Sequence, residues 1–220
     1  MSSSQSFDRS SVEYGRGVSF FDAIYGFAIT LLVTNVDLPA AEAWQSPAGV
    51  WNSGIVGQLF GFLLSFVVIA TFWRVNFRYM SAVTRMSPRI VIWNITASFF
   101  IILLPFSTQG TSDPATAGLP LPTALYALNI ALASLSQTLL YLSARKHGQI
   151  PSMQRTGPAQ TLLHLTVPAV FLASIPVIFL AGPVPGRLVW AILVIASPVA
   201  GRYIVPAEPP PAGTAAAQGS

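Results

Sequence analysis

Residues 20–38 read FFDAIYGFAITLLVTNVDL, and this stretch decides the fold. About 20 consecutive apolar residues are enough for a helix to cross the hydrocarbon core of a bilayer. The run contains only two charged residues, Asp22 and Asp37, and it ends directly before Pro39. Proline terminates or kinks a helix because it lacks the backbone N–H and clashes with the preceding turn. The stretch therefore predicts one transmembrane helix.

The composition of the whole chain agrees with a membrane location. Of 220 residues, 53% are hydrophobic and only 8% are charged, whereas soluble domains carry about 25% charged residues. Too few charges remain to cover a water-facing surface, which excludes a soluble globular enzyme and a disordered protein. The chain has no Cys and only two separated His residues, so we expect no metal centre, no cofactor and no enzymatic activity.

Five further apolar stretches have a similar length, so the sequence predicts an all-α integral membrane protein with six transmembrane helices. We expect the six spans at Phe20–Leu38, Ser53–Phe72, Ile90–Phe106, Leu121–Leu142, Leu162–Leu180 and Leu188–Val205. The Ser-rich segment 1–15 and the Pro- and Ala-rich segment 206–220 are expected to be disordered, which leaves 16–205 as the six-span domain.

The basic residues predict the orientation of the spans. An even number of spans places both termini on one side, and ten of the eleven Lys and Arg residues then share that side, leaving only Arg187 on the other. Lys and Arg are retained in cytoplasmic loops. We therefore expect a multi-pass protein of the cell membrane with both termini in the cytoplasm. The basic surplus is a topology signal and predicts no nucleic-acid partner.

The segment Ala41-Glu42-Ala43 resembles a signal-peptidase cleavage site after the first span. Three features disfavour cleavage: the apolar run is longer than a signal core, it contains Asp22, and a long polar arm precedes it. We therefore expect the first span to be retained.

Asp22 lies inside an apolar run, where a charge is costly unless it is paired or faces the protein interior. One interpretation is that it only begins the helix, where a negative charge suits the helix dipole. The other, which we favour, is a polar network with residues at the same depth in neighbouring spans. That structural network is expected to comprise Arg16, Asp22, Trp73, Asn76, Trp93 and Asn94, with Arg74 as a further candidate.

Phe27, Leu31, Thr34 and Leu38 follow spacings of four, three and four, and so share one face of a helix. This mostly apolar face could contact lipid, pack inside the protein, or line a pore formed by several copies of the helix. The second span carries a different stripe of small residues, Ser53, Gly57, Gly61 and Ser65. Such stripes let helices pack closely in membranes.

The first three spans resemble the transmembrane protein 175 family, the endolysosomal and prokaryotic potassium channels, of which this chain resembles the prokaryotic six-span type. The resemblance rests on Arg16, Phe20 and Asp22 with the helix from Ala28 to Val33 and Pro39, on Ser65-Phe66 and Phe72-Trp73, and on Trp93-Asn94 with Leu103 to Thr108. Two positions depart from the family pattern: Phe21 replaces a Ser, and Asn76-Phe77 stands where many members have a His pair.

The resemblance implies a homotetramer in which the first helix of each subunit lines a central pore for potassium ions. It implies that Leu31 forms an apolar gate, that Phe27 constricts the inner side and that Leu38 lines the outer part. It also implies a potassium site at a ring of Thr34 hydroxyls, with modest selectivity. The alternatives are a secondary transporter, disfavoured because no charge lies at the bilayer midplane, and a non-conducting membrane scaffold.

Overall fold

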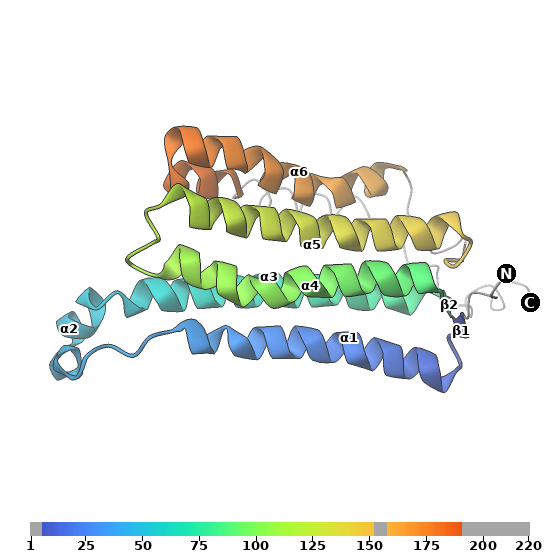
Figure 1. The fold of residues 1–220 in the computed structure, drawn as a ribbon, viewed down its shortest axis with the longest axis horizontal. Coiled ribbons are helices and arrows are strands. Elements are labelled where there is room, and N and C mark those ends of the chain that lie inside the picture. The colour runs from blue at the N-terminus through green and yellow to red at the C-terminus, as the bar shows by residue number, and fades with distance from the viewer. Residues whose placement is uncertain (1–5, 152–157, 191–220) are drawn as a thin grey trace, which may run out of the picture.

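The computed structural model describes residues 6–151 and 158–190 and is built from long, roughly parallel helices (Figure 1). Four helical stretches are long and apolar enough to cross a membrane, namely Val12–Asn35, Ile55–Ala82, Pro88–Ser112 and Pro120–Lys146. They correspond to the first four predicted spans. The fifth prediction falls on α6 (Pro158–Ala181), and the sixth lies largely outside the described residues, of which 183–190 are helical.

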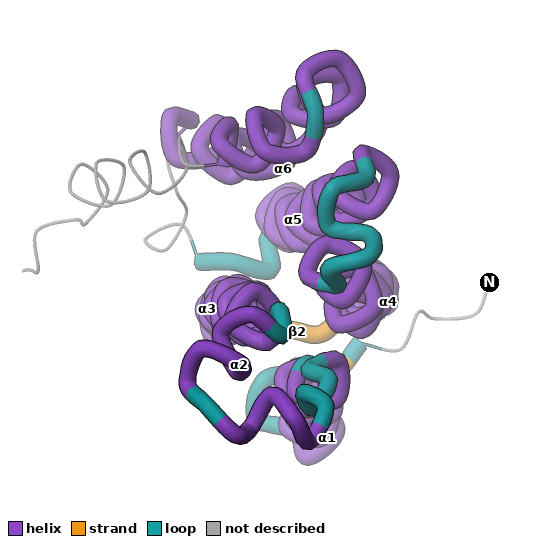
Figure 2. Tube along the Cα trace, turned by 90° about the vertical axis from the view of Figure 1, so that its left-hand side faces the viewer, coloured by secondary structure: helices purple, strands orange, loops and turns teal. Residues whose placement is uncertain are grey.

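The helices form layers, with α1 (Val12–Leu31) at one edge (Figures 1 and 2). Next to α1 lie α3 (Ile55–Ala82) and α4 (Pro88–Ser112), followed by α5 (Pro120–Lys146) and then α6. The contacts between elements follow the same order: α1 packs on α3 and α4, α4 packs on α5, and α5 packs on α6. The first helix therefore has one face against the bundle and one face directed away from it.

The most polar of the predicted spans is the most buried of the four long helices, α5. Its polar side chains form hydrogen bonds with other groups inside the bundle, as buried polar groups without access to water must do. Gln137 donates from Nε2 to the Tyr25 hydroxyl at 2.8 Å and to the Phe72 carbonyl at 3.0 Å, which links α5 to α1 and α3. Polar composition in this span is a sign of central position.

A two-stranded antiparallel sheet closes the end of the bundle where α1 begins. Strand β1 (Phe7–Asp8) pairs with β2 (Arg85–Met86), which lies between α3 and α4. The described part of the segment 1–15 is therefore ordered, and the expectation of a disordered arm was wrong for residues 6–15. The reason is non-local: β1 has its pairing partner some 80 residues away in the sequence, at Arg85–Met86.

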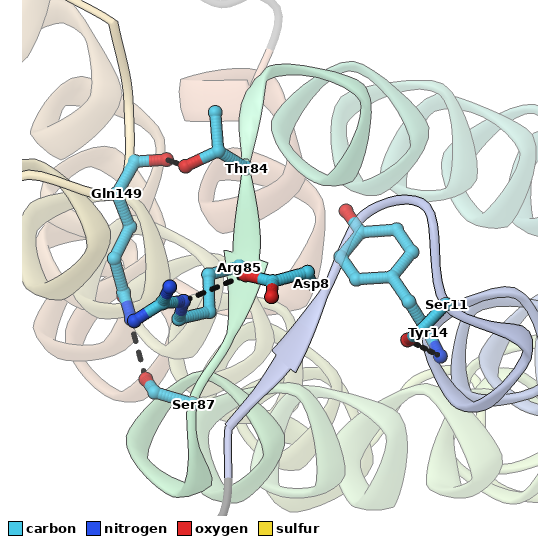
Figure 3. A network of polar contacts seen from close by, with 7 residues as sticks. All are labelled: Asp8, Ser11, Tyr14, Thr84, Arg85, Ser87 and Gln149. Carbon is cyan, nitrogen blue, oxygen red and sulfur yellow. Dashed lines mark hydrogen bonds and ion pairs between the residues drawn. The ribbon is translucent and has the colours of Figure 1, made fainter.

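Polar contacts reinforce this sheet, as Figure 3 shows. Arg85 Nε lies 2.9 Å from Asp8 Oδ1, and the Gln149 carbonyl accepts from the Thr84 hydroxyl at 3.1 Å. Ser11 caps α1 by accepting from the backbone N–H of Tyr14 at 3.2 Å. The Tyr14 hydroxyl donates to the Met80 carbonyl at 2.6 Å, so the start of α1 is fixed to the end of α3.

At the opposite end, a compact segment connects α1 to α3. It contains the 3-10 helices η1 (Val33–Asn35) and η2 (Ala41–Gln45) and the short helix α2 (Pro47–Asn52). Gly54 joins α2 to α3 with a φ of 85°, a left-handed conformation that favours glycine. This segment joins the ends of α1 and α3 that lie away from the β1–β2 sheet, and these two helices carry most of the predicted functional residues.

Candidate pore helix and its supporting contacts

The stripe predicted on the first helix lies on the face of α1 that is directed away from the bundle. Phe27 is 71% exposed and Leu31 is 45% exposed, and Thr34 is also exposed. The other face is buried against α3 and α4 through Phe21, Tyr25, Ala28 and Leu32. Within one subunit, the stripe is thus a free surface that lipid, a pore or another copy can cover.

The prediction that Leu38 shares this helical face is wrong, because the helix ends earlier. The α-helix stops at Leu31, and the 3-10 helix η1 continues only to Asn35. The backbone N–H of Asp37 instead donates to Gln58 Oε1 at 2.8 Å, which holds the chain against α3. The ring of Pro39 clashes with helical geometry at the residue before it, which keeps Leu38 out of a helix. Leu38 is 83% exposed on the non-helical connection.

Thr34 has a side-chain geometry suited to coordinating a cation. Its hydroxyl donates to the Leu31 carbonyl at 2.7 Å, and Thr30 makes the equivalent bond to the Phe27 carbonyl at 2.8 Å. A hydroxyl carries one hydrogen and two acceptor lone pairs. Because the hydrogen of Thr34 points back to the helix, its lone pairs remain available on the exposed side.

Side chains of Asn35 and Gln58 hold the segment that follows α1, at the end of the bundle away from the β1–β2 sheet. Asn35 Nδ2 donates to the Pro105 carbonyl of α4 at 2.6 Å. Gln58 of α3 contacts Asp37 through both the backbone N–H and the carboxylate, the latter at 3.4 Å. Asn35 and Gln58 were not among the residues predicted from the sequence, although an amide side chain inside an apolar stretch is a signal for such a contact.

Asp22 forms a hydrogen bond with one of its predicted partners. Trp73 Nε1 donates to Asp22 Oδ1 at 2.9 Å, across from α3 to α1. Asn76 and Asn94 form a separate buried pair at 2.8 Å between α3 and α4. The network predicted around Asp22 is therefore present as two separate pairs, Asp22 with Trp73 and Asn76 with Asn94.

Three other candidates lie outside these pairs. Within the described residues, the side chain of Arg16 is exposed and makes no hydrogen bond, and neither Trp93 nor Arg74 bonds to Asp22. Membrane depth predicted which residues lie level with one another, but it contains no information on the direction of each side chain around its helix.

The predicted small-residue stripe does not begin on α3, because Ser53 is the C-cap of α2 and lies before Gly54, and its other members on α3 have different environments. Ser65 is buried and accepts from the Thr108 hydroxyl at 2.7 Å, and it lies 3.2 Å from the Tyr126 hydroxyl. Gly61 lies against Ser112 of α4, so closely that a Cβ there would overlap the serine side chain. Gly57 has open space at the Cβ position, and Ser53 is exposed. Only Gly61 and Ser65 pack inside the subunit.

Comparison with known proteins agrees with these observations. Residues 16–105 match the family described as the endosomal/lysosomal potassium channel TMEM175. A potassium channel from Streptomyces collinus, B446_29190, is 28% identical over 98 residues, which cover 44% of this chain and 46% of that protein. The matched region thus spans about half the length of this curated relative.

The fold is similar to that of a solved protein. The crystal structure of a lysosomal potassium-selective channel TMEM175 homolog from Chamaesiphon minutus matches with a TM-score of 0.68 at 20% identity, covering 84% of this chain and 96% of that one. The family is one of ion channels and is not an enzyme class. Sequence and fold together confirm that this all-helical chain, through residues 16–105, resembles the TMEM175 potassium channels.

Proposed function

We propose that the protein is a homotetrameric, passive, potassium-selective cation channel of the cell membrane, with its pore lined by α1 of each subunit. The observation that carries the proposal is the exposed stripe of Phe27, Leu31 and Thr34 on a helix whose other face is buried. One helix cannot enclose a pore, so several copies around a common axis are required, and the resemblance to the family implies four. The family match over α1, α3 and α4 supports this assembly.

Each residue of the stripe has a different role along the proposed pore. Leu31 forms an apolar ring, and a narrow apolar constriction blocks hydrated ions because water leaves it. Phe27 narrows the inner side, and Thr34 supplies a ring of hydroxyl oxygens for an ion that has lost water. Hydroxyls bind less strongly than a cage of backbone carbonyls, which fits modest selectivity for potassium over sodium.

The proposed orientation follows the two ends of the bundle. Basic residues gather at the end that holds the β1–β2 sheet, and they include Arg9, Arg85, Arg89, Arg145 and Lys146. Asp37, Glu42 and Asp113 lie in the connections at the other end. The basic end is assigned to the cytoplasm, and six spans place both termini there.

A flux assay in liposomes tests the proposal. The purified protein should dissipate a potassium gradient faster than a sodium gradient, without saturation and without a coupled ion. Leu31→Ser should increase the flux, because a hydroxyl keeps water in the constriction. Leu172→Ser is the matched control, since Leu172 is 44% exposed on α6, at the far edge of the bundle from α1.

Saturable uptake that requires a second ion would contradict the channel proposal and indicate a secondary transporter. Unchanged flux in Leu31→Ser, or an equal rise in Leu172→Ser, would remove Leu31 from the gate.

A further inference from the structure

A cavity of 280 Å³ opens where α4 ends and α5 begins, at the end of the bundle opposite the β1–β2 sheet. Its walls include Phe106, Gln109 and Asp113 from α4 and its cap, with Leu121 and Leu125 from the first turns of α5. Ligand pockets usually measure about 300–1,000 Å³. The cavity volume lies just below this range, so the cavity is large enough for the headgroup of a lipid but not for a whole lipid.

The walls change from polar to apolar along the helix. From Asp113 to Phe106 is about 10 Å of rise, at 1.5 Å per residue. Asp113 and Gln109 lie at the end of the helix, while Phe106 is 71% exposed and faces the middle of the span with Leu125 beside the same cavity. A polar end at the membrane surface with an apolar strip below it matches the shape of a lipid.

The Asp113 carboxylate has one oxygen available as an acceptor and forms no ion pair within the described residues. Oδ1 accepts from the backbone N–H of Ala115 at 2.7 Å, whereas Oδ2 accepts from no described donor. Arg187, a basic residue at this end, donates through Nη2 to the Ala117 carbonyl at 2.9 Å and to the Thr123 hydroxyl at 3.0 Å and forms no ion pair with Asp113.

Gln109 supplies a donor one turn away. Its side-chain amide makes no hydrogen bond to the described residues, and its backbone carbonyl accepts from the N–H of Asp113 at 2.9 Å. Side chains four apart on a helix have Cβ atoms roughly 5–6 Å apart. The cavity thus offers a carboxylate for a cation and an amide N–H for an anion, separated by a distance comparable to the two-carbon bridge of an ethanolamine phosphate group.

We propose that this cavity binds a phospholipid with an ethanolamine headgroup, in the outer leaflet under the orientation given above. The primary ammonium donates to Asp113 Oδ2, the phosphate accepts from the Gln109 amide, and an acyl chain follows Phe106 and Leu125 toward the bilayer centre. A choline headgroup has no N–H to donate. A glycerol headgroup has no cation, so its anionic lipid meets the Asp113 carboxylate without compensation.

Lipid binding to the full-length protein tests the assignment. Delipidated protein in detergent is titrated with phosphatidylethanolamine, phosphatidylcholine or phosphatidylglycerol of identical acyl chains, and bound lipid is counted by native mass spectrometry. The ethanolamine lipid should bind about tenfold more tightly than the choline lipid, as expected for one charge-assisted hydrogen bond. Asp113→Asn should abolish this preference.

Matched variants separate binding from folding. Asp113→Asn keeps an Oδ1 acceptor for Ala115, and Asp113→Glu keeps the charge and should retain the preference. Glu42→Gln removes a carboxylate from η2 at the same end and should change nothing. Unfolding temperatures of the lipid-free variants identify any that are misfolded.

Three results would overturn the assignment: equal affinity for the ethanolamine and choline lipids, a preference that survives Asp113→Asn, or equal binding of soluble glycerophosphoethanolamine. The assay measures lipid and needs no ion flux. Its failure therefore leaves the channel proposal intact, and a failed flux assay leaves the lipid site intact.

Discussion

Replacing Gly61 by alanine adds one methyl group at the place where α3 meets the end of α4. The new Cβ would overlap the hydroxyl of Ser112 and lie 2.9 Å from its Cβ. Rotation of the serine hydroxyl cannot relieve the second contact, because the Cβ is fixed by the backbone. The helices themselves must therefore move apart. Gly57, one turn away on the same stripe, has nothing within 4 Å of its Cβ position and is the natural control.

The two substitutions should have opposite signs. Alanine in place of glycine stabilises a helix by about 1 kcal/mol, and overpacking costs about 1–3 kcal/mol. Gly57→Ala should therefore raise the free energy of unfolding by about 1 kcal/mol. Gly61→Ala should change it by between zero and about −2 kcal/mol, so the two variants should differ by about 1–3 kcal/mol, the overpacking cost alone.

Thermal unfolding of the protein in detergent measures the difference. For a chain of this size, 1 kcal/mol corresponds to a shift of about 2–4 °C in Tm. Ser112→Gly removes both clashing atoms, so Gly61→Ala combined with Ser112→Gly should lose the penalty, as a double-mutant cycle would reveal. If Gly61→Ala raises the Tm as much as Gly57→Ala does, then the close approach of α3 and α4 at Ser112 is refuted.

Three further predictions concern the side chains that serve or support α1. Thr34→Ala should lower the ratio of potassium to sodium flux in liposomes, because it removes the proposed hydroxyl ring; an unaltered ratio places selectivity elsewhere. Gln137→Leu should lower the Tm and the free energy of unfolding by about 1–3 kcal/mol, since it leaves the buried Tyr25 hydroxyl without its partner, and an unchanged Tm contradicts the bridge. Trp73→Phe and Asp22→Ala remove the same hydrogen bond, so the Tm of the double variant should fall by less than the sum of the single losses; additive losses would show that the two side chains act separately.

Hydropathy predicted the existence of the first helix but not the residue at which it begins. The apolar run predicted a span beginning at Phe20, but the helix begins at Val12. The additional turns contain Glu13 and Arg16 and are not apolar, so hydropathy gives no signal there. They are held by the Ser11 cap and by the bond from Tyr14 to α3. The second of these contacts is long-range and has no local signature in the sequence.

The candidate site shows the same division. Spacing alone predicted that Phe27, Leu31 and Thr34 share one face, and all three side chains are exposed, the first two on α1 and Thr34 on η1. Spacing could not predict that the helix ends before Leu38, because the contact of Asp37 with Gln58 that competes with it comes from another helix. Depth in the membrane likewise predicted the partner of Asp22 but added Arg16 and Trp93, whose side chains point elsewhere.

The proposed pore has no charged side chain, so under that proposal the end of the first helix would be what favours a cation. The α-helix ends at Leu31 and the 3-10 helix η1 continues it to Asn35, so the partial negative charge of the helix C-terminus lies within one turn of Thr34. A helix end carries roughly half an elementary charge, which falls off within the last turn. In the proposed tetramer, four such ends would surround the ion at the level where the Leu31 ring removes its water. A helix that continued to Leu38 would carry this end three residues, or about 4.5 Å, further from the proposed gate. In the proposed pore, the early termination, which the sequence pattern did not predict, would keep the favourable dipole ends within about one turn of the Leu31 ring and the Thr34 hydroxyls.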